Sequence, residues 1–500
     1  MSEIRVNYSG FLIFVISIVT AISTSVVTII ITRTLVVEDF GLWTLISSLL
    51  IYSLVLDPII SIWTTRNISR KIEIGKTPLY SSSVFSIGGI LVYLLAILLI
   101  GDPKDFTILI LAGILIPPMY LLKVVNSINL GWKPESRAFS LFTVELIKIP
   151  VLITLYFGFG LTLEGVIISQ FCGLVGGICI GLFYARKKLK SGFKIEYLKK
   201  WIKVSWITLY PFVNVMLQRT DVVIFSIITG SVVGLAYFGA GQVIAGLVVI
   251  AATFSGSIYA KLLGTKNKDN FKYDLTLQVF LIILFVSLII AFFKQALFTL
   301  NPIYIDVYII GIILAIKFAF YGLGSVLEVS LLGLEKIDLN SKVNHKEYMK
   351  SKLFSVPSII NIKFSVYLLS LVPFLIFANE TYSILELIIG WSLLALISEI
   401  IGTSYFYIQV KKQLGKILDV KSIIKYIFVG ILVIFVTDFL TEQFVVYDLD
   451  LINHIINWIP ILIISTSIFL GLSYSIDKKI RNFVNAIIKE IIKILNNFFK

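Results

Sequence analysis

The fold is decided by residues 205–261, which read SWITLYPFVNVMLQRTDVVIFSIITG and then SVVGLAYFGAGQVIAGLVVIAATFSGSIYAK. This stretch predicts two apolar helices joined by a tight turn at Thr229-Gly230. The first helix contains two ionised side chains, Arg219 and Asp221. A charge in the hydrocarbon core costs about 3 kcal/mol or more, so such residues usually face a protein interior or a water-filled cavity. The stretch therefore predicts a membrane hairpin that carries a buried polar site.

The composition of the whole chain is that of a membrane protein. Of 500 residues, 58% are hydrophobic and only 14% are charged, and the mean hydropathy is +0.97. Soluble domains are about half apolar and about a quarter charged. The net charge of +14 matters less than where its lysines and arginines lie, and it does not predict a nucleic-acid partner. The two cysteines, Cys172 and Cys179, are too few for a disulfide scaffold or a zinc site.

Apolar runs predict an all-α polytopic fold with about fourteen transmembrane helices. The runs cover residues 10–31, 41–63, 80–101, 106–125, 138–158, 164–185, 204–228, 232–260, 274–298, 305–330, 358–378, 383–410, 422–440 and 453–475. Alternate joins hold nearly all of the basic residues, and the others are short and poor in lysine and arginine. The excess of positive charge in cytoplasmic loops predicts that both termini and the basic joins are cytoplasmic.

The middle of the chain divides these helices into lobes. Residues 186–203 (RKKLKSGFKIEYLKKWIK) predict a basic amphipathic segment on anionic headgroups, with an ordinary topogenic loop as the alternative. A small turn followed by hydrophobe-Gly-Leu-aromatic occurs at both 32–43 and 229–237, with one extra residue in the second copy, which suggests parallel repeats. The predicted parts are an N-lobe (1–185), the linker (186–203), a C-lobe (204–410), two appended helices (411–475) and an amphipathic cytoplasmic tail (476–500).

Two of these motifs resemble those of a known transporter group. Residues 33–35 (RTL) with 38–43 (EDFGLW), and residues 219–221 (RTD) with 233–237 (VGLAY), are similar to the lobe entries of the multidrug/oligosaccharidyl-lipid/polysaccharide (MOP) exporter superfamily. The resemblance is to its polysaccharide-synthesis branch, the Wzx-type flippases of lipid-linked oligosaccharides. It implies two six-helix bundles in a V around a central cavity, plus two C-terminal helices. It also implies alternating access that moves a polyprenyl-(pyro)phosphate-linked oligosaccharide to the outer leaflet.

A flippase needs fixed positive charge in a hydrated cleft, because it carries an anionic headgroup through a low-dielectric layer. Guanidinium and ammonium groups pair with phosphate oxygens. We therefore expect a cationic cavity that is lined by Arg219, Lys317, Lys148 and Arg33. The alternatives stay open: Lys148 is three residues after Glu145, which allows a neutralised pair on one helix face, and Arg33 could extend to the outer headgroups.

Acidic residues in the spans are candidates for binding a coupling proton or Na+. They are Asp57, Asp221, Glu399 and Glu145, and the alternative for each is an ion pair with a basic neighbour. Asp57 also precedes Pro58, so it is expected at a helix break whose freed backbone groups need partners.

The sequence does not predict an enzyme. It has no phosphate-binding Gly-Lys-Ser/Thr loop, no Gly-x-Ser-x-Gly and no His-rich cluster, so we expect no metal and no cofactor. Two alternatives to the flippase remain, a cation-coupled multidrug exporter of the same fold and a membrane-embedded polysaccharide polymerase or ligase. The expected partners are the lipid-linked oligosaccharide, membrane lipids, the coupling ion, and glycosyltransferases or a polymerase. The expected location is the plasma membrane.

Overall fold

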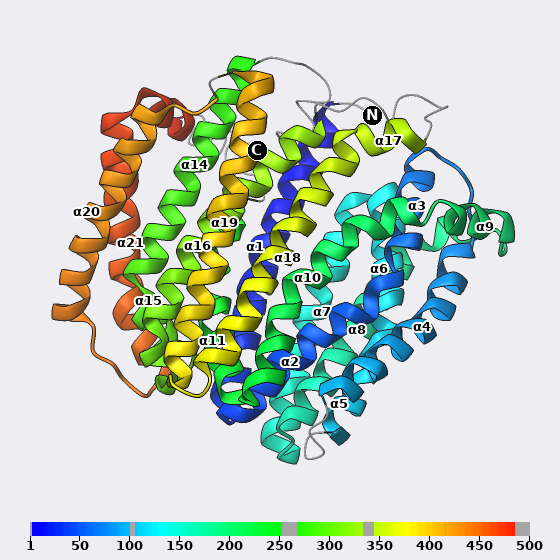
Figure 1. The fold of residues 1–500 in the computed structure, drawn as a ribbon, viewed down its shortest axis with the longest axis horizontal. Helices are drawn as coiled ribbons and strands as arrows, with labels where there is room; N and C mark the ends of the chain where they lie inside the picture. The colour runs from blue at the N-terminus through cyan, green and yellow to red at the C-terminus, as the bar shows by residue number, and fades with distance from the viewer. Residues whose placement is uncertain (1–2, 101–105, 253–267, 334–344, 416, 486–500) are drawn as a thin grey trace, which may run out of the picture. The chain divides into compact units, whose positions relative to one another are not determined.

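The structure, a computed structural model, describes residues 3–100, 106–252, 268–333, 345–415 and 417–485 (Figure 1). Helices, turns and short joins make up these ranges, and they contain no strand. Within the described ranges, thirteen helical stretches are long and apolar enough to cross a membrane, and Ile22–Thr34 is a shorter apolar stretch. The prediction of an all-α polytopic fold is therefore confirmed.

The chain divides into two compact units, each with its own set of contacts. The first contains residues 1–236 and 375–379. Its helices are α1 (Glu3–Thr34), α2 (Val37–Ser53), α3 (Pro58–Ser69), α4 (Thr77–Ile100), α5 (Phe106–Ala112), α6 (Ile116–Trp132), α7 (Pro134–Ile153), α8 (Leu163–Ala185), α9 (Ile195–Lys203) and α10 (Trp206–Thr229). Helix α10 packs against α2 and α3.

The second unit contains residues 237–374 and 380–500. Helix α11 (Val232–Ala245) begins in the first unit and continues into the second unit at Tyr237. The further helices are α12 (Val248–Ala252), α14 (Lys268–Ala291), α15 (Phe293–Leu300), α16 (Tyr308–Gly333), α17 (His345–Lys350), α18 (Lys352–Ala378), α19 (Ile384–Leu414), α20 (Val420–Phe444) and α21 (Leu451–Ile476). Helices α20 and α21 pack together and against α14 (Figure 1). The lobe limits expected from the sequence stay a prediction.

Each unit places apolar side chains outward and polar ones between its helices. Leu99 of α4 in the first unit is 79% exposed, and Leu369 of α18 in the second unit is 73% exposed. By contrast, the buried hydroxyl of Thr437 on α20 lies 2.7 Å from that of Ser465 on α21. Lipid solvates apolar side chains but offers no partner to a polar one, so this arrangement fits a protein surrounded by hydrocarbon.

Two helix breaks in the first unit leave backbone carbonyls that tyrosines satisfy. Between α2 and α3, a 3-10 turn at Leu54–Leu56 precedes Pro58, and Tyr120 donates to the carbonyl of Ser53 at 2.7 Å. Between α5 and α6, Tyr93 donates to the carbonyl of Leu109 at 2.8 Å. An unsatisfied carbonyl in the hydrocarbon layer costs several kcal/mol, so these bonds make the breaks tolerable.

The two similar motifs of the sequence meet in space. A Cβ added to Gly41 on α2 would overlap the backbone carbonyl of Val232 at the start of α11, and it would lie 3.3 Å from the amide nitrogen of Ala236. Only glycine permits this approach of two helix backbones. The glycine in the EDFGLW motif therefore has a packing role.

The basic linker contains a short docked helix. Trp201 on α9 is 1% exposed and belongs to a core cluster with residues of α3 and α6, whereas Lys199, Lys200 and Lys203 are exposed. The amide nitrogen of Lys194 donates to Thr77 Oγ1 at 2.8 Å, which fixes the segment to the start of α4. Helix α9 thus has one face packed on the protein and another that presents lysines. The amphipathic tail expected at 476–500 is described only up to residue 485. In that part, Ile480 of its apolar face is buried.

Candidate functional site

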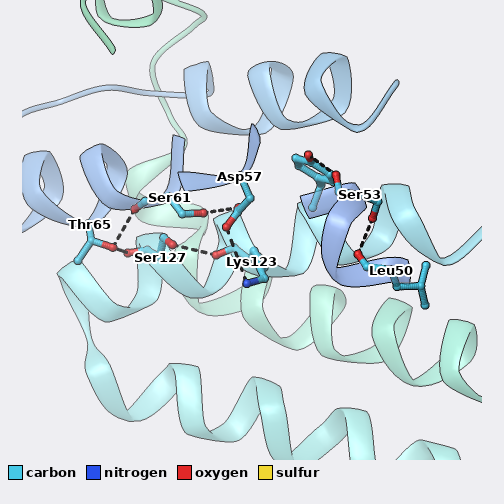
Figure 2. Close-up of polar contacts among 8 residues, drawn as sticks. Leu50, Ser53, Asp57, Ser61, Thr65, Lys123 and Ser127 are labelled. Atoms are coloured by element: carbon cyan, nitrogen blue, oxygen red, sulfur yellow. Dashed lines mark hydrogen bonds and ion pairs between the residues drawn. The ribbon is translucent and has the colours of Figure 1, made fainter. Parts of the chain in front are cut away.

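The first unit contains a cavity of about 390 Å³ with mixed polar and apolar walls. It lies among α3, α6, α7 and α8 and includes Asp57 at the helix break (Figure 2). The polar lining residues are Asp57, Ser61, Lys123, Asn126, Ser127 and Arg137, and the apolar ones are Met119, Leu122, Leu130, Leu141 and Leu174.

Asp57 is held at the cavity by the break that Pro58 causes. Proline cannot donate a backbone hydrogen bond in a helix interior, so it favours the first position of a new helix, and α3 begins at Pro58. The Ser61 hydroxyl, one turn into α3, donates to Asp57 Oδ1 at 2.5 Å (Figure 2). Asp57 is only 5% exposed. The break therefore places one buried carboxylate beside the cavity.

Two cationic side chains, Lys123 and Arg137, line the cavity together with this carboxylate. Lys123 Nζ of α6 lies 3.9 Å from Asp57 Oδ2, and its side chain is 45% exposed. This contact is longer than a hydrogen bond, so the ammonium keeps donors for another acceptor. Arg137, near the start of α7, is exposed, and no ion pair joins it to the other residues that the structure describes. If all three groups are ionised, the cavity carries one excess positive charge.

A buried amide adds hydrogen-bonding capacity. Asn126 is 8% exposed, and its side-chain oxygen has no hydrogen-bond partner among the described residues. Ser127, the next residue, donates its hydroxyl to the carbonyl of Lys123 at 2.9 Å (Figure 2). Buried polar groups normally have partners. The cavity thus combines cations, an amide oxygen that can accept a bond, and an apolar wall, which suits an amphiphilic ligand with an anionic group.

The second unit contains a different lysine–acid arrangement. Lys363 Nζ of α18 lies 3.0 Å and 2.9 Å from the two carboxylate oxygens of Glu399 on α19. The two side chains are 7% and 5% exposed. Among the charges that act on Glu328 of α16 are those of Lys363 and Glu399. Helices α18 and α19 therefore hold a buried ion pair between one ammonium and one carboxylate.

For Lys148, the structure shows the ion pair with Glu145, which the sequence left open as an alternative. Its Nζ lies 2.7 Å from Glu145 Oε2 on the same face of α7, and the side chains are 10% and 14% exposed. A Cβ on Gly173 of α8 would lie 2.7 Å from Lys148 Cγ, so the lysine stem packs closely on that helix. Roles for Lys148 in anion binding and for Glu145 in ion coupling stay predictions.

The other predicted residues lie in both units and are partly or fully buried. Arg33, at the end of α1, and Arg219, on α10, are half-buried in the first unit. Asp221 is 6% exposed and acts electrostatically on Tyr52, whose hydroxyl lies 2.5 Å from Thr220 Oγ1. Lys317 belongs to the second unit, where its Nζ lies 4.6 Å from the ring centroid of Phe318. Their common cavity stays a prediction.

Sequence reasoning identified Asp57 and Glu399 but not their lysines. Lys123 and Lys363 both fall inside predicted spans, close to the ends. A signal existed, because a cation inside a span needs a partner or water whatever its distance from the end. Their partners are 66 and 36 residues away in sequence, so the pairs themselves required the structure.

Comparisons with known proteins give the fold. No protein-family model and no curated protein matches the chain. Among solved structures, the chain resembles the lipid II flippase MurJ in an inward closed conformation, with a TM-score of 0.61, 16% identity and coverage of 92% of this chain and 99% of MurJ.

Multidrug transporters are also similar. An inward-facing multidrug resistance MATE family transporter of the MOP superfamily gives a TM-score of 0.61 at 15% identity, over 79% of this chain and 96% of that one. The bent form of the Vibrio cholerae MATE transporter VcmN gives 0.53 at 13% identity, over 82% and 97%. The chain is a multi-pass membrane protein with the fold that these flippase and multidrug-transporter structures share.

Proposed function

We propose that the chain is a flippase that moves a polyprenyl-(pyro)phosphate-linked oligosaccharide from the cytoplasmic to the outer leaflet by alternating access. The observation that carries this proposal is the cavity of the first unit. Lys123 and Arg137 offer charge to phosphate oxygens, Asn126 offers an acceptor to a sugar hydroxyl, and leucines line the rest. An anion with both a glycan and a lipid attached is complementary to these walls.

The structural similarities support the same class of substrate. MurJ is described as a lipid II flippase, and it resembles this chain over nearly its whole length. A lipid-linked anion is thus compatible with the fold. In this proposal Arg219, Lys317, Lys148 and Arg33 supply further positive charge along the route. The protein lies in the plasma membrane with cytoplasmic termini, and glycosyltransferases and a polymerase make and use the glycan.

Export of organic cations is a second candidate, and Asp57 is the observation that favours it. A buried carboxylate at a cavity can bind a cationic drug once Lys123 moves away, since the two atoms are 3.9 Å apart. Two of the similar structures are MATE transporters. The cavity as a whole has two cations to one acid, however, which favours an anion.

The test is transport by the purified full chain in liposomes with a fluorescent polyprenyl-pyrophosphate oligosaccharide. We expect Lys123→Ala and Arg137→Ala each to lower the flipping rate about 10-fold or more, because a charge-assisted hydrogen bond contributes about 1.5–3 kcal/mol. The matched control is Lys133→Ala. Lys133 lies between α6 and α7, and its Nζ is 4.0 Å from Glu135 Oε1. It is not among the residues that line the cavity.

Three outcomes are informative. Loss of flipping in both cavity variants, with Lys133→Ala unchanged, supports the proposal. Wild-type rates in Lys123→Ala and Arg137→Ala contradict the cavity as the anion site. Transport of a fluorescent organic cation but not of the lipid-linked probe would favour the exporter instead.

A further inference from the structure

Helix α9 exposes apolar side chains on the face that is turned away from the protein. Its inner face is covered, because Trp201 is buried in a core cluster with residues of α3 and α6. On the outer face, Ile195 and Ile202 are 46% and 48% exposed, and Phe193, just before the helix, is 44% exposed. Positions seven residues apart lie on one face of a helix, so the two isoleucines form an exposed apolar stripe. A helix that covered the protein and met only water outside would be polar on this face.

Two lysines lie beside this apolar stripe. Lys199 is four residues after Ile195 and three before Ile202, which places it on the same side of α9. Lys203 follows one turn later. Both lysines are exposed, and no ion pair joins either of them to another residue that the structure describes. Apolar side chains flanked by lysines are typical of a helix that lies in the headgroup layer of a membrane.

A second basic segment, the join between α3 and α4, is fixed to the segment that precedes α9. The backbone amide of Lys76 donates to the carbonyl of Ser191 at 3.0 Å. Gly75 has a φ of +56°, and a Cβ added there would overlap the carbonyl oxygen of Ser191, so glycine permits this approach. Helix α9 also packs against α3 and α4 (Figure 1). Residues 66–76 and 186–203 thus form one surface, the basic platform.

The basic platform is strongly positive and lies at a membrane surface. It contains twelve lysines and arginines but only two glutamates. Its two segments adjoin the spans Thr77–Ile100 and Leu163–Lys188. Lys188 Nζ lies 3.9 Å from the ring centroid of Trp132, which is partly exposed at the end of α6, and tryptophan is enriched at membrane–water interfaces. The platform therefore presents positive charge at the depth where lipid phosphates lie.

We propose that the basic platform is a binding surface for the headgroups of anionic phospholipids. Lys199 and Lys203 pair with phosphate oxygens, and Ile195 and Ile202 insert between the lipids. The charge selects an anionic partner, because an anionic leaflet attracts basic segments at its surface. The exposed isoleucines select a lipid, because a soluble anion would leave them in water. The proposal concerns how the chain meets its own bilayer, and it does not rest on the flippase function.

The direct test is hydrogen–deuterium exchange of the full chain in nanodiscs of phosphatidylglycerol or of phosphatidylcholine. We expect the protection factors of the amides in residues 186–203 to be about fivefold higher or more in phosphatidylglycerol, since one lysine near an anionic surface contributes about that factor. High salt should reduce the difference, because exposed charges are screened. Soluble glycerol phosphate added to the phosphatidylcholine discs should not reproduce it.

Two double variants separate charge from apolar contact. Lys199→Gln with Lys203→Gln should bring the protection factors in the two lipids close together, because the paired ammonium groups are gone. Ile195→Ser with Ile202→Ser should lower the protection factors in both lipids and leave a difference between them, because insertion does not depend on headgroup charge. Thermal unfolding in detergent checks that each variant is folded, as expected for changes of exposed side chains.

The matched control is Lys411→Gln with Lys412→Gln, which removes two exposed lysines at the end of α19. This variant should keep the full difference between the lipids in residues 186–203. Equal protection in the two lipids for the wild type would overturn the proposal, as would a difference that the Lys199 and Lys203 variant retains or the control loses. Protection by glycerol phosphate equal to that by phosphatidylglycerol would overturn the choice of a lipid.

Discussion

The two units each contain a lysine beside a buried acid, but the two pairs differ in geometry. In the first unit, Lys123 is 45% exposed and 3.9 Å from Asp57. In the second, Lys363 is 7% exposed and hydrogen-bonded to both oxygens of Glu399. The loose pair, which is partly exposed, keeps its ammonium donors for a ligand, whereas the sealed pair is buried and directs two of its three donors to Glu399. An ammonium beside a carboxylate is thus suited to anion binding in one unit and to a fixed charge balance in the other.

The largest difference between the pairs should appear when each lysine is removed. Lys363→Met leaves the buried Glu399 carboxylate without its lysine, and breaking a buried pair costs about 3 kcal/mol or more. Lys123→Met should cost about 1 kcal/mol or less, because exposed pairs contribute little. Thermal unfolding in detergent measures both.

A double variant separates charge from packing. Lys363→Met with Glu399→Gln removes both charges of the sealed pair, so it should recover most of the stability lost in Lys363→Met. If Lys363→Met and Lys123→Met are equally stable, the distinction between a sealed and a loose pair is wrong.

A smaller effect should follow from crowding the sealed pair. An Ala side chain at position 402 would lie 2.5 Å from Lys363 Cδ, and it would push the lysine stem away from Glu399. Overpacking of this kind costs about 1–3 kcal/mol. Gly402→Ala should therefore lower the unfolding temperature.

Gly471→Ala on α21 is the matched control. No atom lies within 4 Å of a Cβ added there, and Ala stabilises a helix interior by about 0.5–1 kcal/mol relative to Gly. An equal loss of stability in both variants would show that the close approach at position 402 has no special role.

Removal of Asp57 from the loose pair should change substrate affinity in opposite directions for the two candidate functions. Asp57→Asn removes the carboxylate that competes with a bound anion for Lys123. A flippase should then bind the lipid-linked anion more tightly, by about fivefold for a change of about 1 kcal/mol. An exporter of organic cations should instead lose affinity for its substrate. Competition binding with both probes on the full chain measures the sign.

Sequence reasoning predicts local features of this molecule well. Runs of about twenty apolar residues predict helices because the bilayer solvates them and every backbone group is satisfied within the segment. The break at Pro58 follows from the chemistry of proline, and the Lys148–Glu145 pair follows from helical spacing.

The long-range contacts are different. Nothing in the spacing of Lys363 and Glu399 indicates that α18 and α19 bring them together, since they are 36 residues apart. The helix break between α5 and α6 also depends on packing, because the Tyr93 hydroxyl donates a hydrogen bond to the carbonyl of Leu109. Tertiary contacts decide which intramembrane charges are sealed and which face a cavity, so the sequence gives candidates and not their roles.

The smallest effect concerns another lysine–acid pair, which lies outside the membrane spans. Lys479 Nζ lies 2.6 Å from Asp419 Oδ2, and the side chains are 31% and 28% exposed. The hydrogen bond from Lys479 lowers the pKa of Asp419 below its ordinary value. A folded-state pKa that is lowered gives stability above the pKa of the unfolded state, and that stability is lost as the pH falls through the folded-state pKa.

Lys479→Ala should therefore lower stability at neutral pH by about 0.5 kcal/mol, since solvent screens the pair. The difference from wild type should shrink once the pH falls below about 4, the pKa of an unfolded Asp, and it should vanish below the lowered folded-state pKa, where Asp419 is protonated. Lys478→Ala, a change of the exposed neighbour, is the control and should show no such dependence. Unfolding curves at several pH values and at high salt measure the difference. A loss in Lys479→Ala as large as that in Lys363→Met would show that burial is not what separates these pairs.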